Sequence, residues 1–206
     1  MVKTNAWAKS LGIPSEEQLP LEDGFSPVYK RTAREVAVRS LILQGVVAVA
    51  SGVGPEPIVA WFRDQFIWDQ ATPKEKAFLS KKKRSAERRA IMAWHMEAEW
   101  TLLWMMGKVP ALGLPTKLCD SRRLVEEIVP PLGADLGDFL ASAELREPGL
   151  LLAEDERTYN LWCHAQKDKK TRTLPSDLNL DVLYERRYAF EWLDGNQDWD
   201  DVTCDA

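Results

Sequence analysis

Residues 85–107 read SAERRAIMAWHMEAEWTLLWMMG, and this stretch decides the fold. Ser85 can cap a helix, because its hydroxyl can accept a hydrogen bond from the first turn. No proline follows until Pro110, and Gly107 is a typical residue for a helix to end on. After Ala90 the apolar side chains nearly encircle the helix axis, which is typical of a helix buried on every side. The stretch therefore predicts one long core helix.

Three polar residues decide between a core helix and a membrane span. His95, Glu97 and Glu99 interrupt the apolar stretch before it reaches roughly 18 residues, the length at which a membrane span is expected. We therefore expect this helix in the core of a globular domain and expect no association with a membrane.

Glu97 is the residue of this helix with the greatest chemical interest. On the helical wheel it lies beside Thr101, with Trp100 and Trp104 as neighbours. A carboxylate among indole rings must find a partner or take up a proton. A buried ion pair or a hydrogen bond to a helix end would make Glu97 structural. The alternatives are partial exposure and a role as a catalytic acid or base.

The rest of the chain shows helical spacing of apolar residues and no convincing alternating strand pattern. Thr72, Pro73 and Glu75 have the pattern of a capping box, so a helix begins there. In the helix before it, Phe66 and Ile67 are expected on the buried side. Further helices are expected at 30–51, 56–70, 121–129, 134–145, 150–168 and 181–193. The predicted fold class is all-α, a single compact domain of about seven to nine helices around a buried central Trp-rich helix.

The predicted domain organisation has two parts. Residues 1–27 contain several prolines and glycines and are expected to form a leader that packs on the body, and residues 28–206 form the helical domain. The opening residues MVKTNAWAKSLGIP lack the apolar core that a secretory signal needs. The three cysteines are scattered and form no CxxC pair, which is typical of reduced thiols in the cytoplasm.

The predicted last helix carries two opposite charges inside its apolar face. Glu185 and Arg186 are adjacent in DVLYERRYAFEWLDG, so they point about 100° apart and cannot easily pair with each other. Each therefore needs a partner on another element. We expect Glu97 as the partner of Arg186, and Arg39 or another arginine as the partner of Glu185.

The acidic tail NQDWDDVTCDA follows this helix, and Trp199 and Val202 are expected to anchor the tail to the body. Its carboxylates are Asp198, Asp200, Asp201 and Asp205. Four carboxylates could bind a divalent cation, but their spacing is not that of an EF-hand loop, so an exposed tail is predicted. The cysteines and histidines show no zinc-ligand spacing either. No metal and no cofactor are therefore expected.

The charge balance restricts the class of partner. The formal net charge of −5 and the sequence pI of about 5.2 argue against general nucleic-acid binding, which requires a basic face. The same balance is compatible with a basic protein partner. The one basic run, Lys81–Arg84, lies between two predicted helices and is interpreted as a solvated loop rather than a nucleic-acid patch.

Two motifs resemble a known family. The ending YERRYAFEWLDGNQDWDDVTCDA and the central WHMEAEWTLLWMMGKV, with the link PTKLCD, are similar to the bacterial family catalogued as domain of unknown function 4272. In that family the ending follows YER-x-x-A-x-x-W-L and then WDDV-x-x-D, and the central pattern is E-A-x-W-x-L-L-W. The ending falls here on Tyr184, Glu185, Arg186, Ala189, Trp192, Leu193, Trp199, Asp200, Asp201, Val202 and Asp205, and the central pattern on Glu97, Ala98, Trp100, Leu102, Leu103 and Trp104. The resemblance extends from about Leu11 to the end and departs at Arg187 and Tyr188, where a polar pair such as His-Arg is usual. The resemblance implies a soluble, mostly helical bacterial protein. It points to no particular activity.

Two hypotheses about function remain. The absence of GxGxxG, P-loop, GxSxG and HExxH motifs favours a non-enzymatic protein-binding module of an immunity or regulatory type, with structural charges in its apolar faces. The alternative is an enzyme of unrecognised type with an acidic and aromatic pocket. The candidate residues are Glu97, Trp100, Trp104, Tyr184, Glu185, Arg186, Trp192, Trp199, Asp200 and Asp201, and none is assigned a catalytic role. An enzyme would require Glu97, Arg186 and Asp200 to converge on a cavity open to solvent.

Overall fold

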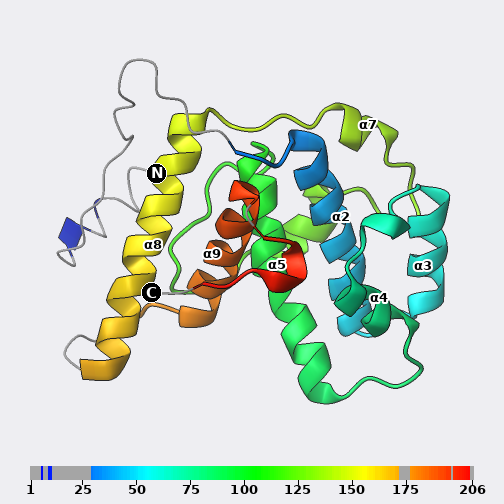
Figure 1. The fold of residues 1–206 in the computed structure, drawn as a ribbon, viewed down its shortest axis with the longest axis horizontal. Helices are drawn as coiled ribbons and strands as arrows, with labels where there is room; N and C mark the ends of the chain where they lie inside the picture. The colour runs from blue at the N-terminus through cyan, green and yellow to red at the C-terminus, as the bar shows by residue number, and fades with distance from the viewer. Residues whose placement is uncertain (1–5, 7–8, 11–28, 172–176, 196, 205–206) are drawn as a thin grey trace.

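Helix α5 (Ala86–Met105) runs through the middle of the computed structural model, which describes residues 6, 9–10, 29–171, 177–195 and 197–204 (Figure 1). The Ser85 hydroxyl accepts a hydrogen bond from the N–H of Arg88, and Gly107, at φ +73°, lies in the turn that ends the helix. Residues 97–105 are all buried, whereas residues 86–91 are exposed. The predicted core helix is therefore confirmed, and its C-terminal half is the part that forms the core.

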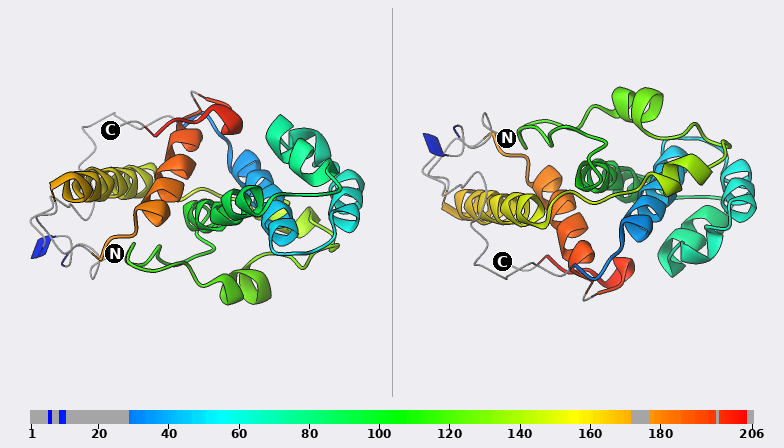
Figure 2. Two further views of the ribbon diagram at one scale, coloured as in Figure 1. Left: turned by 90° about the horizontal axis from the view of Figure 1, so that it is seen from below. Right: turned by 90° about the horizontal axis from the view of Figure 1, so that it is seen from above.

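The other helices are arranged in a row with α5 near its centre. Their bounds are α2 Ala33–Ala50, α3 Pro55–Asp64, α4 Pro73–Ser80, α6 Ser121–Arg123, α7 Gly137–Ala141, α8 Pro148–Thr171 and α9 Leu180–Asp194, with 3-10 turns at Trp68–Gln70 and Trp199–Asp201 and a π-helical turn at Leu124–Ile128. Helix α2 packs on one side of α5 and α9 on the other, α8 packs on α9, and α3 and α4 pack on α2 (Figure 2). The described residues form eight α-helices and no strand, which confirms the all-α class. None of these described helices is both long and apolar enough to cross a membrane.

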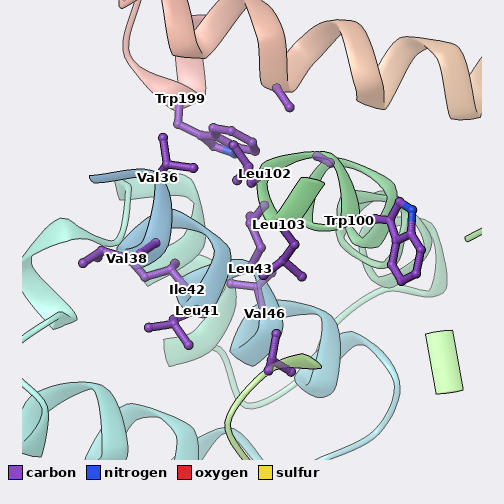
Figure 3. Close-up of a cluster of buried hydrophobic side chains, with 14 of the residues drawn as sticks. Val36, Val38, Leu41, Ile42, Leu43, Val46, Trp100, Leu102, Leu103 and Trp199 are labelled. Atoms are coloured by element: carbon purple, nitrogen blue, oxygen red, sulfur yellow. The ribbon is translucent and has the colours of Figure 1, made fainter. Parts of the chain in front are cut away.

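The centre of the core lies between α2 and α5. Leu43 of α2 faces Leu102 and Leu103 of α5, and Trp199 covers the end of the contact near Val36 (Figure 3). All five side chains are buried. Full burial of a leucine or valine side chain contributes about 1.5–3 kcal/mol, so this contact is a main source of stability.

The segment after α3 differs from the prediction. The expected helix 56–70 ends at Asp64, and Phe66, expected on the buried side, is 89% exposed with φ +57°. The left-handed backbone at Phe66 turns the chain, so that only Ile67 enters the core. The prediction for Phe66 was wrong because helical spacing does not show where a helix stops.

Most other boundaries are close to those predicted, and α7 is the exception. Helix α2 begins later than expected, after a capping box formed by Thr32 and Glu35, and α7 is shorter than the expected helix 134–145. Helix α4 begins at the predicted capping box of Thr72 and Glu75. The predicted leader, residues 1–27, lies outside the described residues except for 6, 9 and 10, so its packing on the body stays a prediction.

Gly45 of α2 packs directly against Ile58 and Phe62 of α3 and provides a test of this packing. A Cβ at this position would lie 2.4 Å from Phe62 Cζ and 2.8 Å from Ile58 Cγ2. Gly45→Ala should lower the free energy of unfolding by about 1–2 kcal/mol in urea denaturation, because overpacking outweighs the gain in helix propensity. Adding Phe62→Leu should recover part of this loss, and additive losses in the double variant would contradict the clash.

Candidate functional site

Glu97 is held by a hydrogen bond near a helix end. The residue is 1% exposed, and its Oε1 accepts the N–H of Cys119 at 2.6 Å. Cys119 precedes Asp120, the N-cap of α6, so one of the predicted structural roles is present. Burial raises the pKa of Glu97, while the Cys119 N–H and the charge of Arg186 act in the opposite direction.

The second carboxyl oxygen of Glu97 differs from the first in accepting no hydrogen bond from the described residues. Glu97 Oε2 is buried and has no hydrogen-bond partner among the described residues. Glu97 also lines a small pocket of about 320 Å³, which we call the Glu97 pocket. Its other lining residues are Ala90, Ala93, Trp94, Met96 and Leu118. A buried carboxyl therefore meets a mainly apolar surface here.

Arg186 is held by backbone carbonyls. It is 3% exposed and donates hydrogen bonds to the carbonyl oxygens of Leu112 at 2.9 Å and Gly113 at 3.0 Å. Burial lowers its pKa to about 10, so it remains charged at neutral pH. The described residues show no ion pair between Arg186 and the expected partner Glu97, although the charge of Arg186 lowers the Glu97 pKa. Arg186 therefore anchors the loop that follows α5 to α9.

Glu185 has a different partner from the one predicted. Its Oε2 lies 3.0 Å from Nδ1 of His95 on α5. Arg39 lies on α2, on the other side of α5, and its Nη1 is 2.7 Å from Glu75 Oε1 on α4. The prediction of an Arg39 or other arginine partner for Glu185 is therefore wrong. The packing of α9 on α5 brings Glu185 to a histidine instead.

The segment Trp199–Asp201 docks beside α2 and the start of α4. Trp199 is 3% exposed, its carbonyl accepts a hydrogen bond from the Tyr188 hydroxyl, and the Arg39 guanidinium lies 5.1 Å from its ring centroid. Asp200 Oδ2 accepts the N–H of Lys74 at 3.0 Å and so satisfies a free donor at the N-terminus of α4. The predicted exposed tail is therefore anchored at these two residues.

A pocket of about 560 Å³, which we call the C-terminal pocket, lies at this junction. The residues relevant here are the cations Arg31, Arg39 and Lys74, the indoles of Trp192 and Trp199, and the acids Glu35, Asp198, Asp200 and Asp201. The cations are held by internal bonds: Arg31 Nη2 donates to the Gln197 carbonyl, Arg39 binds Glu75, and Lys74 Nζ donates to the Asp200 carbonyl. They are therefore occupied within the fold.

Two acids of the C-terminal pocket, Asp198 and Asp201, are exposed, and so is the cation Lys74. The side chain of Asp198 is 88% exposed and that of Glu35 is 42% exposed, compared with 20% for Arg31 and 6% for Arg39. Asp198, which lies 3.7 Å from Arg31, and Asp201 therefore present negative charge to solvent at the rim, beside Lys74.

Comparison with known proteins agrees with the motif resemblance. The family model described as Domain of unknown function (DUF4272) matches residues 2–202. The chain belongs to this family. The search of the curated proteins and the search of the solved structures gave no match.

The ten candidate residues from the DUF4272 motifs do not form one site. Glu97 lines the Glu97 pocket, whereas Trp192, Trp199, Asp200 and Asp201 line the C-terminal pocket. Glu185 and Arg186 are buried, Trp100 and Trp104 are core residues, and Tyr184 is 40% exposed. In the part of the chain that the structure describes, no group of three or more His, Cys, Asp or Glu side chains could hold a metal ion.

Sequence reasoning missed several residues of the C-terminal pocket. Arg31 and Lys74 gave no signal, because nothing in the sequence relates them to a tail more than a hundred residues away. Arg39 did give one, since it is a charge within an apolar helix face, but its partner Glu75 was identified only as part of a capping box.

Glu99 provides a test of burial on α5. It is 0% exposed, neither carboxyl oxygen has a hydrogen-bond partner among the described residues, and burial raises its pKa well above the ordinary value. Below the pKa of about 4.3 that a glutamate has in the unfolded chain, Glu99 is protonated in both the folded and the unfolded protein. Above that pH only the unfolded state releases the proton, so the free energy of unfolding should fall with pH until the folded pKa is reached.

Glu99→Gln should remove this contribution. Urea denaturation between about pH 5 and about pH 8 should show a flatter pH dependence for Glu99→Gln than for the wild type. Glu126→Gln, at an exposed position, should follow the wild type. Parallel curves for the wild type and Glu99→Gln would show that Glu99 is not held protonated by the fold.

Asp200 and Asp201 allow a matched comparison within the DUF4272 motif. Asp200→Ala removes the acceptor at the start of α4 and should lower the free energy of unfolding by about 0.5–2 kcal/mol. Asp201→Ala, at an exposed position, should change it by less than about 0.5 kcal/mol. Chemical denaturation measures both. Equally small effects would contradict the capping role of Asp200.

Proposed function

We propose that this member of DUF4272 is a non-enzymatic protein-binding module of an immunity or regulatory type that acts in the cytoplasm. The observation that supports it is the internal use of the charged motif residues. Glu97 accepts an N–H near a helix end, Arg186 binds two carbonyls, and Asp200 caps α4. An enzyme would need such groups to converge on one open cavity.

The proposed partner is a basic protein, and the proposed contact surface is the C-terminal pocket. Its cations are occupied by internal bonds, and Asp198 and Asp201 at its rim are exposed. Lysine or arginine side chains of a partner would meet negative charge there, and complementary charge promotes association and orients the partner. The overall net charge of −5 acts in the same direction.

The alternative, an enzyme of unrecognised type, has one observation in its favour. Glu97 Oε2 is buried without a partner, Glu97 lines a pocket, and burial raises its pKa toward the range of a general acid. The tail aspartates line the C-terminal pocket rather than this one. The alternative therefore depends on Glu97 and not on the larger cluster.

A charge-reversal capture experiment tests the proposal. Tagged wild-type protein is incubated with cytosol of the source cell and compared with Asp198→Lys/Asp201→Lys. We expect a basic protein in stoichiometric amount on the wild type and its loss from the variant, because the reversed charges repel it. Raising the salt concentration should also weaken capture.

The matched control is Asp64→Lys/Glu156→Lys, which makes the same charge change at exposed positions outside the C-terminal pocket. It should retain the partner, and thermal melting should show that all variants are folded. Equal capture by the pocket variant, or no stoichiometric partner on the wild type, would refute the proposed surface and favour the Glu97 alternative.

A further inference from the structure

The positive charge of the chain is concentrated between α4 and α5. Residues 81–89, KKKRSAERR, contain six cations and one acid, Glu87, in a chain of net charge −5. Except for Arg84, which is partly buried, all of these residues are exposed. The interpretation as a solvated loop therefore applies to most of them, but it does not explain how the side chains are arranged.

Several arginines elsewhere in the fold are held in ion pairs. Carboxylates pair with Arg31, Arg39, Arg122, Arg123, Arg157 and Arg187. The ion pairs found among the described residues include none with Lys81, Lys83 or Arg88. Their charge is therefore available to an external anion.

Three of the free cations surround a single pocket. A pocket of about 470 Å³ lies between the end of α4 and the start of α5, and we call it the basic pocket. It is lined by Lys81, Lys83, Arg84 and Arg88, together with Ser85. Its volume is within the range of about 300–1,000 Å³ that is usual for small-molecule sites.

Arg84 is fixed in place before any ligand binds. Its Nε donates to the Phe78 carbonyl at 2.8 Å, its Nη2 donates to the Leu79 carbonyl at 2.9 Å, and its guanidinium lies 5.0 Å from the Phe78 ring centroid. Its Nη1 has no partner among the described residues. A donor that is already oriented loses little entropy on binding.

We propose that the basic pocket binds a compact phosphate-bearing ligand, such as a diphosphate or triphosphate group. Arginine and lysine together match the charge and acceptor geometry of phosphate oxygens. The cations surround one pocket instead of forming an extended stripe, which favours a small oligophosphate over a duplex nucleic acid. The partial positive charge at the start of α5 adds to the attraction, and Glu87 opposes it.

This site is separate from the proposed protein-binding surface. Helix α4 begins at the C-terminal pocket and ends at the basic pocket, and Lys74 and Lys81 line the two pockets respectively. The two proposals can therefore fail independently.

Isothermal titration calorimetry with inorganic tripolyphosphate tests the inference. Wild-type protein should bind one tripolyphosphate, more weakly as salt is added. Lys83→Ala/Arg88→Ala should weaken binding by about tenfold or more, since it removes two charge-assisted contacts. The control is Lys82→Ala/Arg89→Ala, which removes the same charge from the same run at positions that do not line the pocket. It should weaken binding by less than about threefold.

Each other outcome would overturn the inference. No binding of tripolyphosphate by a folded wild type would do so, and equal weakening in both double variants would show attraction to charge alone. A short DNA duplex that binds more tightly than tripolyphosphate, and depends equally on both pairs, would show a nucleic-acid surface instead. Since all four positions are exposed, thermal melting should give the same midpoint for every variant.

Discussion

The need to enclose the C-terminal half of α5 on every side determines the rest of the structure. A helix that is apolar around its circumference cannot leave one face in water, so α2 covers one side and α9 the other. The same helix carries polar groups into the core, and two of them contact neighbouring elements. Glu97 holds the chain at Cys119, and His95 meets Glu185 of α9. The charges in apolar faces thus fix how the elements join, while the apolar contact supplies most of the stability.

A second junction connects the C-terminal tail to helices α2 and α4. Arg39 binds Glu75 in a buried ion pair and stacks against Trp199. Loss of one partner of a buried pair is destabilising by about 3–5 kcal/mol, because the other charge is left without compensation. Asp200 then caps α4 through Lys74. Trp199 and Asp200 of the DUF4272 ending therefore help to close the fold, whereas Asp201 stays exposed.

The sequence-based predictions were accurate for interactions between residues close together in the chain and inaccurate for interactions between distant ones. The course of α5 and the capping box at Thr72 depend on neighbours a few residues apart, and both were predicted correctly. The partner of Glu185 and the contact of Asp200 with α4 depend on which helices pack together, which one sequence does not show. The prediction for Phe66 was wrong for a related reason. An apolar residue at helical spacing gives no sign that the helix has already ended. The free cations at residues 81–89 were visible, but their pocket was not.

The docking of the tail has a consequence for how the protein is made. Lys74 and its acceptor Asp200 are separated by 126 residues. During synthesis, α2 and α4 leave the ribosome long before the residues that complete their shared face exist. Until then the nascent chain lacks the indole that covers Val36 and Arg39, and contacts of such long range are slow to form. The face shared by α2 and α4 can therefore be completed only after Trp199 and Asp200 have been synthesised.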